Sequence, residues 1–411
     1  LLTGIIAGSY PAIYLSRFSP VRVMKGEFGI SSKAWLRKTL VVVQFTLSIF
    51  LIVGTMLVYK QLKFMQNQKL GYDKEHVLYI RMQGDIKNSY DVIRSAFEKN
   101  PEVENITAAA HLPSNIGSNG GGVDWEGKDP ELRILVSQSI VEFGYTQTMK
   151  IPIVHGRSFD RSYATDRASD SSAAFLINEE MARIMDKENP VGERFSFMGF
   201  QDGRIIGVMK DFHFHSMRDA IEPLAMTIAY PRFLNYIIMR IKPGPVQKTV
   251  EKLEDTWNSV MPEYPFDYHF LDAEYDHMYR AEARMGSLLK YFAIMAILIA
   301  CLGLFGLASF MAENRTKEIG IRKALGSSAR QIILLLSREF SLLVGIAILI
   351  AIPASWYYLH GWLQDYAYRT GLNWWIFALA AGMAFAIALA TVSYQSIRAA
   401  RANPSDSLRY E

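Results

Sequence analysis

Four long stretches without a charged residue constrain this chain more than any other feature. Each is rich in Leu, Ile, Val, Ala and Phe, and together they cover residues 39–59, 291–312, 340–359 and 370–397. A helix needs about 20 residues to cross ~30 Å of hydrocarbon, so each stretch is long enough to span a membrane. The apolar residues 1–16 are predicted to be the end of a preceding span. The polar segment 60–290 must then fold outside the bilayer.

The sequence predicts a membrane α-helical fold with about four full spans, one partial span and an inserted α+β extracytoplasmic domain. The predicted transmembrane helices are 39–59, 291–312, 340–359 and 375–397. The predicted inner segments are the cytoplasmic linker 17–38, the cytoplasmic segment 313–339 and the cytoplasmic tail 398–411. The predicted outer segments are an extracytoplasmic core domain at 60–290, with a helical stalk at 272–290, and a short outer loop at 360–374.

The distribution of Lys and Arg sets the predicted orientation. Short loops rich in these residues stay on the cytoplasmic side. Segments 17–38 and 313–339 each carry six of them, against one and three acidic residues, whereas loop 360–374 carries only Arg369. Because every basic cluster adjoins a span, we expect no binding to nucleic acid. The lipid bilayer is a predicted partner of the chain, since the spans cross it.

A short internal repeat predicts that this chain is the second half of a duplicated protein. Residues 9–13 read SYPAI and residues 393–397 read SYQSI; the paired segments that follow begin at Ser19 and Asn403. The offset is 384 in both cases (393 − 9 and 403 − 19). Transporters are often built from such repeats. The expected unit is one span, a large outer domain and three further spans.

The outer domain is predicted to be α+β because two β-α-β patterns occur in it. The first pattern has strands at 76–81 and 102–109 around a helix at 87–99. The second has strands at 236–241 and 266–271 around a helix at 245–260. Further strands are expected near 174–177, 203–209 and 224–229.

No catalytic residue, cofactor site or metal site is predicted on this chain. His213 and His215 lie near Asp211, but no third ligand at a typical metal spacing accompanies them. Whether the two histidines have another role stays open. The spans lack the acidic and basic residues that carry proton relays in bilayers. Energy for any transport is therefore expected from a partner.

The segment that follows the second stretch carries the most specific motif. Residues 313–328 read ENRTKEIGIRKALGSS, which resembles the signature of MacB/FtsX-type permeases of ABC transporters. Weaker family-like phrases are GY at 71–72, HGRSF at 155–159, NPVG at 189–192, GVMKDFH at 207–213 and ANPSDSLR at 402–409. The internal repeat indicates the duplicated form of this family.

The resemblance implies that the cytoplasmic segment 313–339 is a coupling segment, which docks on cytoplasmic ABC ATPase subunits. These subunits would be partners of this chain. The residues expected to couple to the ATPase are Glu313, Arg315, Lys317, Glu318, Ile321, Arg322, Lys323 and Leu325. Periplasmic adaptor and outer-membrane proteins are further partners that the resemblance implies. The same resemblance places the chain in the bacterial inner membrane, as a multi-pass protein with its large domain in the periplasm.

The expected function is that of an ABC transporter permease that transmits ATPase motion to a periplasmic domain to drive export or extraction. One alternative is a non-transporting mechanotransmitter that regulates periplasmic cell-envelope proteins. A second alternative is a membrane receptor that senses a ligand through its outer domain. The motif at 313–328 favours the first two, since a receptor would normally add a cytoplasmic signalling domain.

Overall fold

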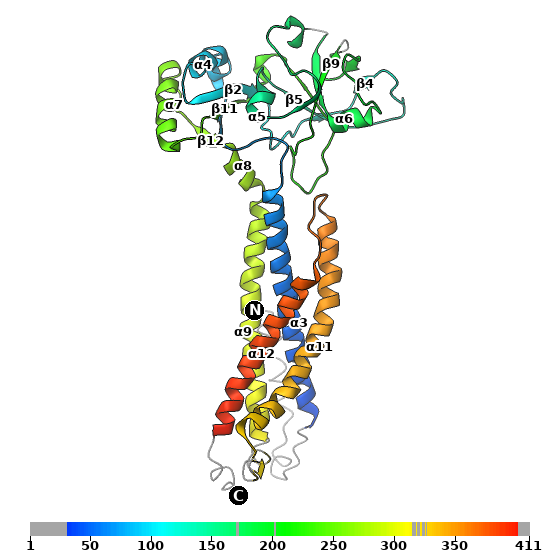
Figure 1. Ribbon diagram of the computed structural model, residues 1–411, viewed down its shortest axis with the longest axis vertical. Helices are drawn as coiled ribbons and strands as arrows, with labels where there is room; N and C mark the ends of the chain where they lie inside the picture. Colours follow the sequence, from blue (N-terminus) through cyan, green and yellow to red (C-terminus); the bar gives the residue numbers. More distant parts are fainter. Residues whose placement is uncertain are drawn as a thin grey trace, which may run out of the picture. The chain divides into compact units, whose positions relative to one another are not determined.

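The computed structural model in Figure 1 describes most of the chain and divides it into two compact units. The described residues are 31–169, 172–200, 203–314, 318, 321–322, 325 and 327–401. The helical unit consists of the described residues up to Leu57, Gly286–His360 and the described residues from Leu372 onwards. The α+β unit consists of Val58–Met285 and Gly361–Gly371.

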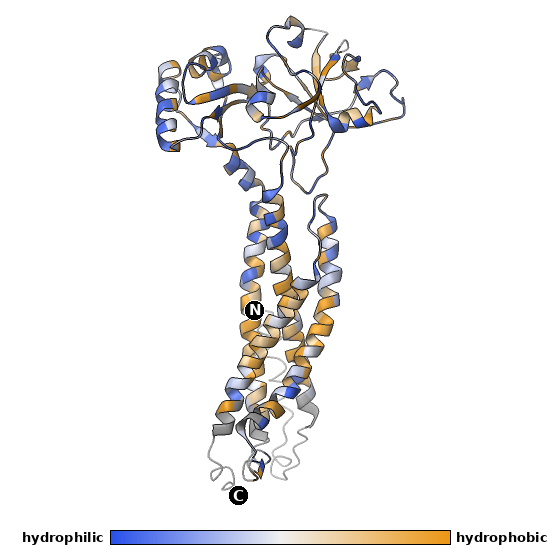
Figure 2. Ribbon diagram, in the orientation of Figure 1, coloured by the Kyte–Doolittle hydropathy of each residue, from blue (hydrophilic) through white to orange (hydrophobic). Residues whose placement is uncertain are grey.

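Four long helices provide the membrane spans. They are α3 (Ser31–Asn67), α9 (Arg280–Asn314), α11 (Ala329–Gln364) and α12 (Trp374–Arg401). All four are long and apolar enough to cross a bilayer, and Figure 2 shows hydrophobic residues along their length. The prediction of four full spans with an inserted α+β domain is therefore confirmed.

Small residues allow the helices of the helical unit to pack closely. Ala300, Ala347 and Ala380 are almost fully buried. At Gly303 a Cβ atom would lie 2.5 Å from Oε1 of Gln44, so α9 tolerates no side chain there without a shift of Gln44. Larger apolar side chains such as Leu302 and Leu349 are exposed. Small residues at helix contacts and large apolar ones facing outwards are typical of packing in membranes.

The first layer of the α+β unit is a four-stranded antiparallel sheet in the order β12-β1-β11-β2. Its strands are β1 (Val77–Arg81), β2 (Val103–Ala109), β11 (Tyr236–Ile241) and β12 (Tyr268–Phe270). Helix α4 (Tyr90–Phe97) joins β1 to β2, and α7 (Val246–Val260) joins β11 to β12. This interleaving of two split β-α-β units is the ferredoxin-like arrangement.

Helices α4 and α7 pack on one face of this sheet because their apolar residues recur at helical spacing. Ile93 and Phe97 from α4 meet Leu253 and Trp257 from α7 in one core cluster. The rings of Phe97 and Trp257 lie 6.5 Å apart. Burying side chains of this size stabilises the fold by about 2–3 kcal/mol each.

A second sheet is inserted between β2 and β11. It has six strands in the order β3-β5-β10-β7-β9-β6, beside a two-stranded pair, β4-β8. The strands are β3 (Asn119–Gly120), β4 (Asp124–Trp125), β5 (Val136–Ile140), β6 (Ile153–Gly156), β7 (Ala174–Asn178), β8 (Phe195–Ser196), β9 (Arg204–Met209) and β10 (Leu224–Thr227). Short helices complete the unit: α5 (Tyr145–Met149), α6 (Glu179–Ile184), α8 (Leu271–Met278), and the 3-10 turns Gly84–Ile86, Ala164–Asp166 and Pro231–Phe233.

The predicted strands lie where they were expected, but their pairing is not that of two simple β-α-β units. Strands β1 and β2 are separated by β11, and β11 and β12 are separated by β1. Each of these four strands therefore pairs with a partner distant in sequence. Short apolar segments locate the strands but contain no information about such pairing.

The structure differs from the predicted stalk at 272–290, because two helices cover it. Helix α8 ends at Met278 and α9 begins at Arg280, with Tyr279 between them. Tyr279 has φ −99° and ψ 13°, and its side chain is 1% exposed. At this break between the two helices the side chain of Tyr279 lies in the core of the α+β unit. The internal repeat cannot be compared, since residues 1–30 and 402–411 lie outside the described residues.

Candidate coupling site

The predicted coupling segment is described in part, and the described residues form an exposed helical turn. Glu318 and Arg322 form an ion pair of 2.7 Å one helical turn apart. Ile321 and Leu325 are 52% and 81% exposed, and the N–H of Leu325 donates to the carbonyl of Ile321. Glu313 lies in the last turn of α9. The other predicted coupling residues, Arg315, Lys317 and Lys323, lie outside the described residues.

The sequence that follows fixes where the next helix starts. The N–H of Ser328 donates to Oε1 of Gln331 at 2.9 Å, and the N–H of Gln331 donates to Oγ of Ser328 at 3.4 Å. This reciprocal pair is a capping box, which satisfies backbone donors at a helix start. Helix α11 accordingly begins at Ala329. The exposed turn is thus held between α9 and a well-defined start of α11.

Contacts between helices near this turn join α3 to its neighbours in the helical unit. The guanidinium of Arg37 lies over the ring of Phe310 at 4.3 Å, which links α3 to α9. Lys38 pairs with Glu339 at 3.5 Å, which links α3 to α11. In the sequence, Arg37 and Lys38 belong to the basic segment 17–38 and indicate only which side of the membrane it faces. Their contacts could not be predicted without knowing which helices are neighbours.

A second set of contacts lies within the α+β unit, where the loop between α11 and α12 binds to the end of α3. Gln61 is fully buried. Its Nε2 donates to the carbonyl of Tyr368 at 2.9 Å, and its Oε1 accepts from the N–H of Thr370 at 2.8 Å. One side-chain amide therefore bridges two backbone groups of this loop, which we call the strap (residues 366–371).

The strap also binds to the folded core of the α+β unit. The N–H of Ala367 donates to the carbonyl of Arg218 at 2.8 Å. The N–H of Tyr368 donates to the carbonyl of Met217 at 3.3 Å. The N–H of Met217 in turn donates to the hydroxyl of Tyr279 at 3.1 Å. The clasp formed by Gln61, Met217, Tyr279 and the strap therefore joins the chain segments that lead to α3, α9, α11 and α12.

Buried tyrosines support the clasp from the core side. The hydroxyl of Tyr275 lies 3.4 Å from that of Tyr279 and 3.3 Å from the carbonyl of Met65 near the end of α3. Burial raises the pKa of Tyr275 well above its usual range, and its hydrogen bond to Tyr279 adds to the shift. The phenol therefore stays neutral near pH 7 and keeps its donor proton.

The two histidines considered as metal ligands have separate partners. The ring of His213 lies edge-on to that of Tyr368 at 4.6 Å, so it packs against the strap. Burial lowers the pKa of His213. His215 lies 3.7 Å from Glu222 instead. No group of three potential metal ligands occurs among the described residues.

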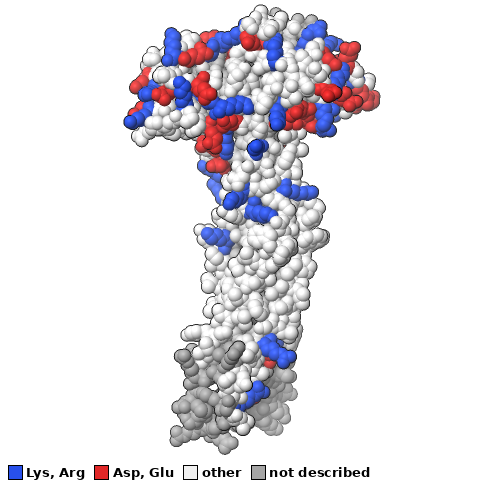
Figure 3. All heavy atoms as spheres, viewed as in Figure 1, with Lys and Arg blue, Asp and Glu red and all other residues white. Residues whose placement is uncertain are grey.

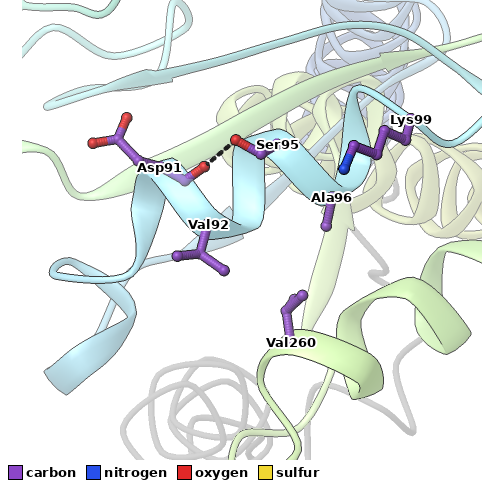
Figure 4. Close-up of a pocket in the computed structure, with 6 residues that line it drawn as sticks. All are labelled: Asp91, Val92, Ser95, Ala96, Lys99 and Val260. Atoms are coloured by element: carbon purple, nitrogen blue, oxygen red, sulfur yellow. Dashed lines mark hydrogen bonds between the residues drawn. The ribbon is translucent and has the colours of Figure 1, made fainter.

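Surface hollows of about 500 Å³ occur among the described residues of the α+β unit. The first lies between α4 and α7 and is lined by Asp91, Val92, Ser95, Ala96, Lys99 and Val260, with Ser95 bonded to the backbone of Asp91 (Figure 4). In the second, Arg167 pairs with the buried Glu142 at 2.7 Å.

The clasp could not be predicted from the sequence. Gln61 follows the first uncharged stretch and carries no charge, so it gave no signal beyond a polar residue near a span. Its partners Tyr368 and Thr370 are about 310 residues away in sequence. Sequence analysis predicted the outer loop at 360–374 but could not predict what it binds.

The clasp predicts a local effect of Gln61→Leu. The leucine side chain lacks the Nε2 donor and the Oε1 acceptor of Gln61. The Thr370 N–H and the Tyr368 carbonyl therefore lose their partners, which costs about 1–3 kcal/mol for each buried group. Hydrogen–deuterium exchange at the Thr370 amide of the full chain should accelerate by about tenfold or more. Unchanged exchange would contradict the clasp.

Thr370→Val is the matched control. The hydroxyl of Thr370 is buried and has no hydrogen-bond partner in the structure. A methyl group in its place keeps the backbone N–H and its bond to Gln61. Replacing an unpaired buried polar group by an apolar one is nearly neutral or stabilising. Exchange at residue 370 should therefore stay slow in this variant.

Comparison with known proteins agrees with the arrangement of helices and motif. Residues 291–404, which include most of α9, the coupling turn, α11 and α12, match the family model of the FtsX-like permease C-terminal region. The chain is 24% identical over 291 residues to an uncharacterized ABC transporter permease, YknZ, of Bacillus subtilis. That match covers 65% of this chain and 68% of the relative.

Solved structures of outer regions show weaker similarity. The periplasmic region of MacB from Actinobacillus actinomycetemcomitans is 14% identical with a TM-score of 0.35, covering 53% of this chain and 97% of that one. The extracellular domain of YknZ, described as a noncanonic ABC-type transporter from Gram-positive bacteria, is 12% identical with a TM-score of 0.32, covering 47% and 97%. The chain is thus similar to ABC transporter permeases, with four helices long and apolar enough to span a membrane, and its residues 291–404 match the FtsX-like permease C-terminal region.

Proposed function

We propose that this permease transmits movement from a cytoplasmic ABC ATPase to its α+β unit, and that this movement drives export or extraction of a substrate. The observation that carries the proposal is the continuity of α9. This helix runs without interruption for 35 residues from Arg280 to Asn314. At 1.5 Å per residue it extends about 52 Å, which exceeds the hydrocarbon layer by about 20 Å.

One end of α9 adjoins the core of the α+β unit, and the other end adjoins the 313–328 motif. At one end Tyr279 directly precedes the helix and lies in the core of the α+β unit. At the other end Glu313 and Asn314 lead into the motif that includes Glu318 and Arg322. A helix whose backbone hydrogen bonds are all internal transfers displacement along its axis. Movement of the motif would therefore reach the α+β unit through one element.

The proposed location is the bacterial inner membrane, with the α+β unit in the periplasm. The concentration of Lys and Arg in segments 17–38 and 313–339 supports this orientation. Association with an ATPase subunit follows from the permease family. Periplasmic adaptor and outer-membrane proteins are further proposed partners, because exported molecules would have to leave the periplasm.

The coupling role is tested by Glu318→Lys combined with Arg322→Glu. This exchange keeps an ion pair within the turn, so a merely solvated loop should tolerate it, since exposed pairs contribute only ~0–1 kcal/mol. At an interface with an ATPase, reversed charges should cost about 2–5 kcal/mol. We expect normal membrane insertion but loss of ATPase co-purification and of ATP-dependent activity.

Arg94→Glu combined with Glu98→Arg is the matched control. This pair on α4 has the same spacing and a similar length of 2.6 Å. It lies in the α+β unit, away from the coupling turn, so the exchanged pair should leave ATPase association unchanged. A Glu318/Arg322 double variant that retains its ATPase at the level of this control would refute the coupling role.

The orientation is tested by cysteine labelling in a Cys301→Ser background. Gly121 and Glu126 are exposed in the α+β unit, and Leu325 is exposed in the coupling turn. Gly121→Cys and Glu126→Cys should react with an impermeant thiol reagent in intact spheroplasts. Leu325→Cys should react only after lysis. The reverse pattern would overturn the proposed topology.

A further inference from the structure

Three basic residues are brought together where α3 and the strap meet. Lys60 and Lys63 are three residues apart on α3, so they are neighbours on one helix surface. Gln61, which lies between them in sequence, binds the backbone of Tyr368 and Thr370, the two residues that flank Arg369. Nζ of Lys60 also donates to the carbonyl of Gly371 at 2.8 Å. The clasp therefore holds Lys60, Lys63 and Arg369 close to one another.

Within the part of the chain that the structure describes, these three charges have no acidic ion-pair partner. Among the described residues, no carboxylate forms an ion pair with Lys60, Lys63 or Arg369. Segment 58–67 contains no acidic residue, and Asp365 is the one acidic residue in 361–371. Lys63 and Arg369 are exposed and Lys60 is half-buried. Figure 3 shows charged side chains of both signs over the α+β unit and a few basic side chains further along the helices.

The position of these residues along the chain sets their depth relative to the bilayer. Lys60 directly follows the uncharged stretch 39–59, and Lys63 follows it by four residues, or about 6 Å of helix. Arg369 directly precedes the stretch 370–397. The headgroup layer adds roughly 5–7 Å on each side of the hydrocarbon. All three residues are therefore expected at the depth of the lipid headgroups.

We propose that Lys60, Lys63 and Arg369 form a binding site for the phosphate of anionic phospholipid headgroups. Gathering like charges is unfavourable unless an anion balances them. Ammonium and guanidinium groups both donate charge-assisted hydrogen bonds to phosphate. Because the clasp holds these residues together, the bound lipid stabilises the strap on α3. The site depends on the membrane spans and the clasp, and not on the proposed transmission of ATPase movement.

The test is lipid selectivity of the purified full-length chain in bilayers. Brominated phosphatidylglycerol and brominated phosphatidylcholine are compared as quenchers of the fluorescence of Trp362 and the other tryptophans. The wild type should prefer phosphatidylglycerol by about fivefold for each basic residue that contributes. The triple variant Lys60→Gln, Lys63→Gln, Arg369→Gln should lose this preference, and 0.5 M NaCl should weaken it in the wild type.

Two further variants separate charge at this site from charge elsewhere. The conservative variant Lys60→Arg, Lys63→Arg, Arg369→Lys should keep the preference. A control with four exposed basic residues of the α+β unit neutralised, at Lys99, Arg133, Lys242 and Lys248, should also keep it. Equal quenching by both lipids in the wild type, or full preference in the triple glutamine variant, would overturn the proposal. Abolition by millimolar inorganic phosphate, but not by chloride at equal ionic strength, would assign the site to free phosphate instead.

Discussion

The backbone of a membrane-crossing segment must satisfy its own hydrogen bonds, and the rest of this structure depends on that constraint. It makes the spans helical and makes α9 continuous from Arg280 to Asn314. The helix does not stop at the edge of the hydrocarbon, since polar residues from Arg280 to Lys290 extend it. One uninterrupted helix therefore leads from Tyr279 in the core of the α+β unit to the start of the 313–328 motif.

The clasp complements this connection. Helix α3 continues to Asn67 inside this unit, and Gln61 binds the loop between α11 and α12 to it through two hydrogen bonds. Tyr279, directly before α9, accepts a hydrogen bond from Met217. Every chain segment of the α+β unit that leads to a span is thus held at one place.

Much of this fold could be predicted from the sequence, because spans and strands depend on local hydrophobic patterns. The strands predicted at 236–241 and 102–109 are found at Tyr236–Ile241 and Val103–Ala109. The placement of β11 between β1 and β2 could not be predicted, because pairing across more than 120 residues leaves no local pattern. For the same reason the role of Gln61 could not be predicted, because its partners Tyr368 and Thr370 follow two further spans in the sequence. The break at Tyr279 depends on core packing around its ring rather than on a helix-breaking residue.

The central claim is that α9 carries movement between the coupling motif and the α+β unit. The most direct measurement is the spin-label distance between positions 334 and 99, in a Cys301→Ser chain with its ATPase bound, with and without ATP. Insertion of two glycines between Ala283 and Arg284 makes the helix flexible outside the hydrocarbon. We predict an ATP-dependent change of this distance in the uninterrupted chain and its loss after the insertion, with the ATPase still bound. An equal change in both proteins would contradict the claim.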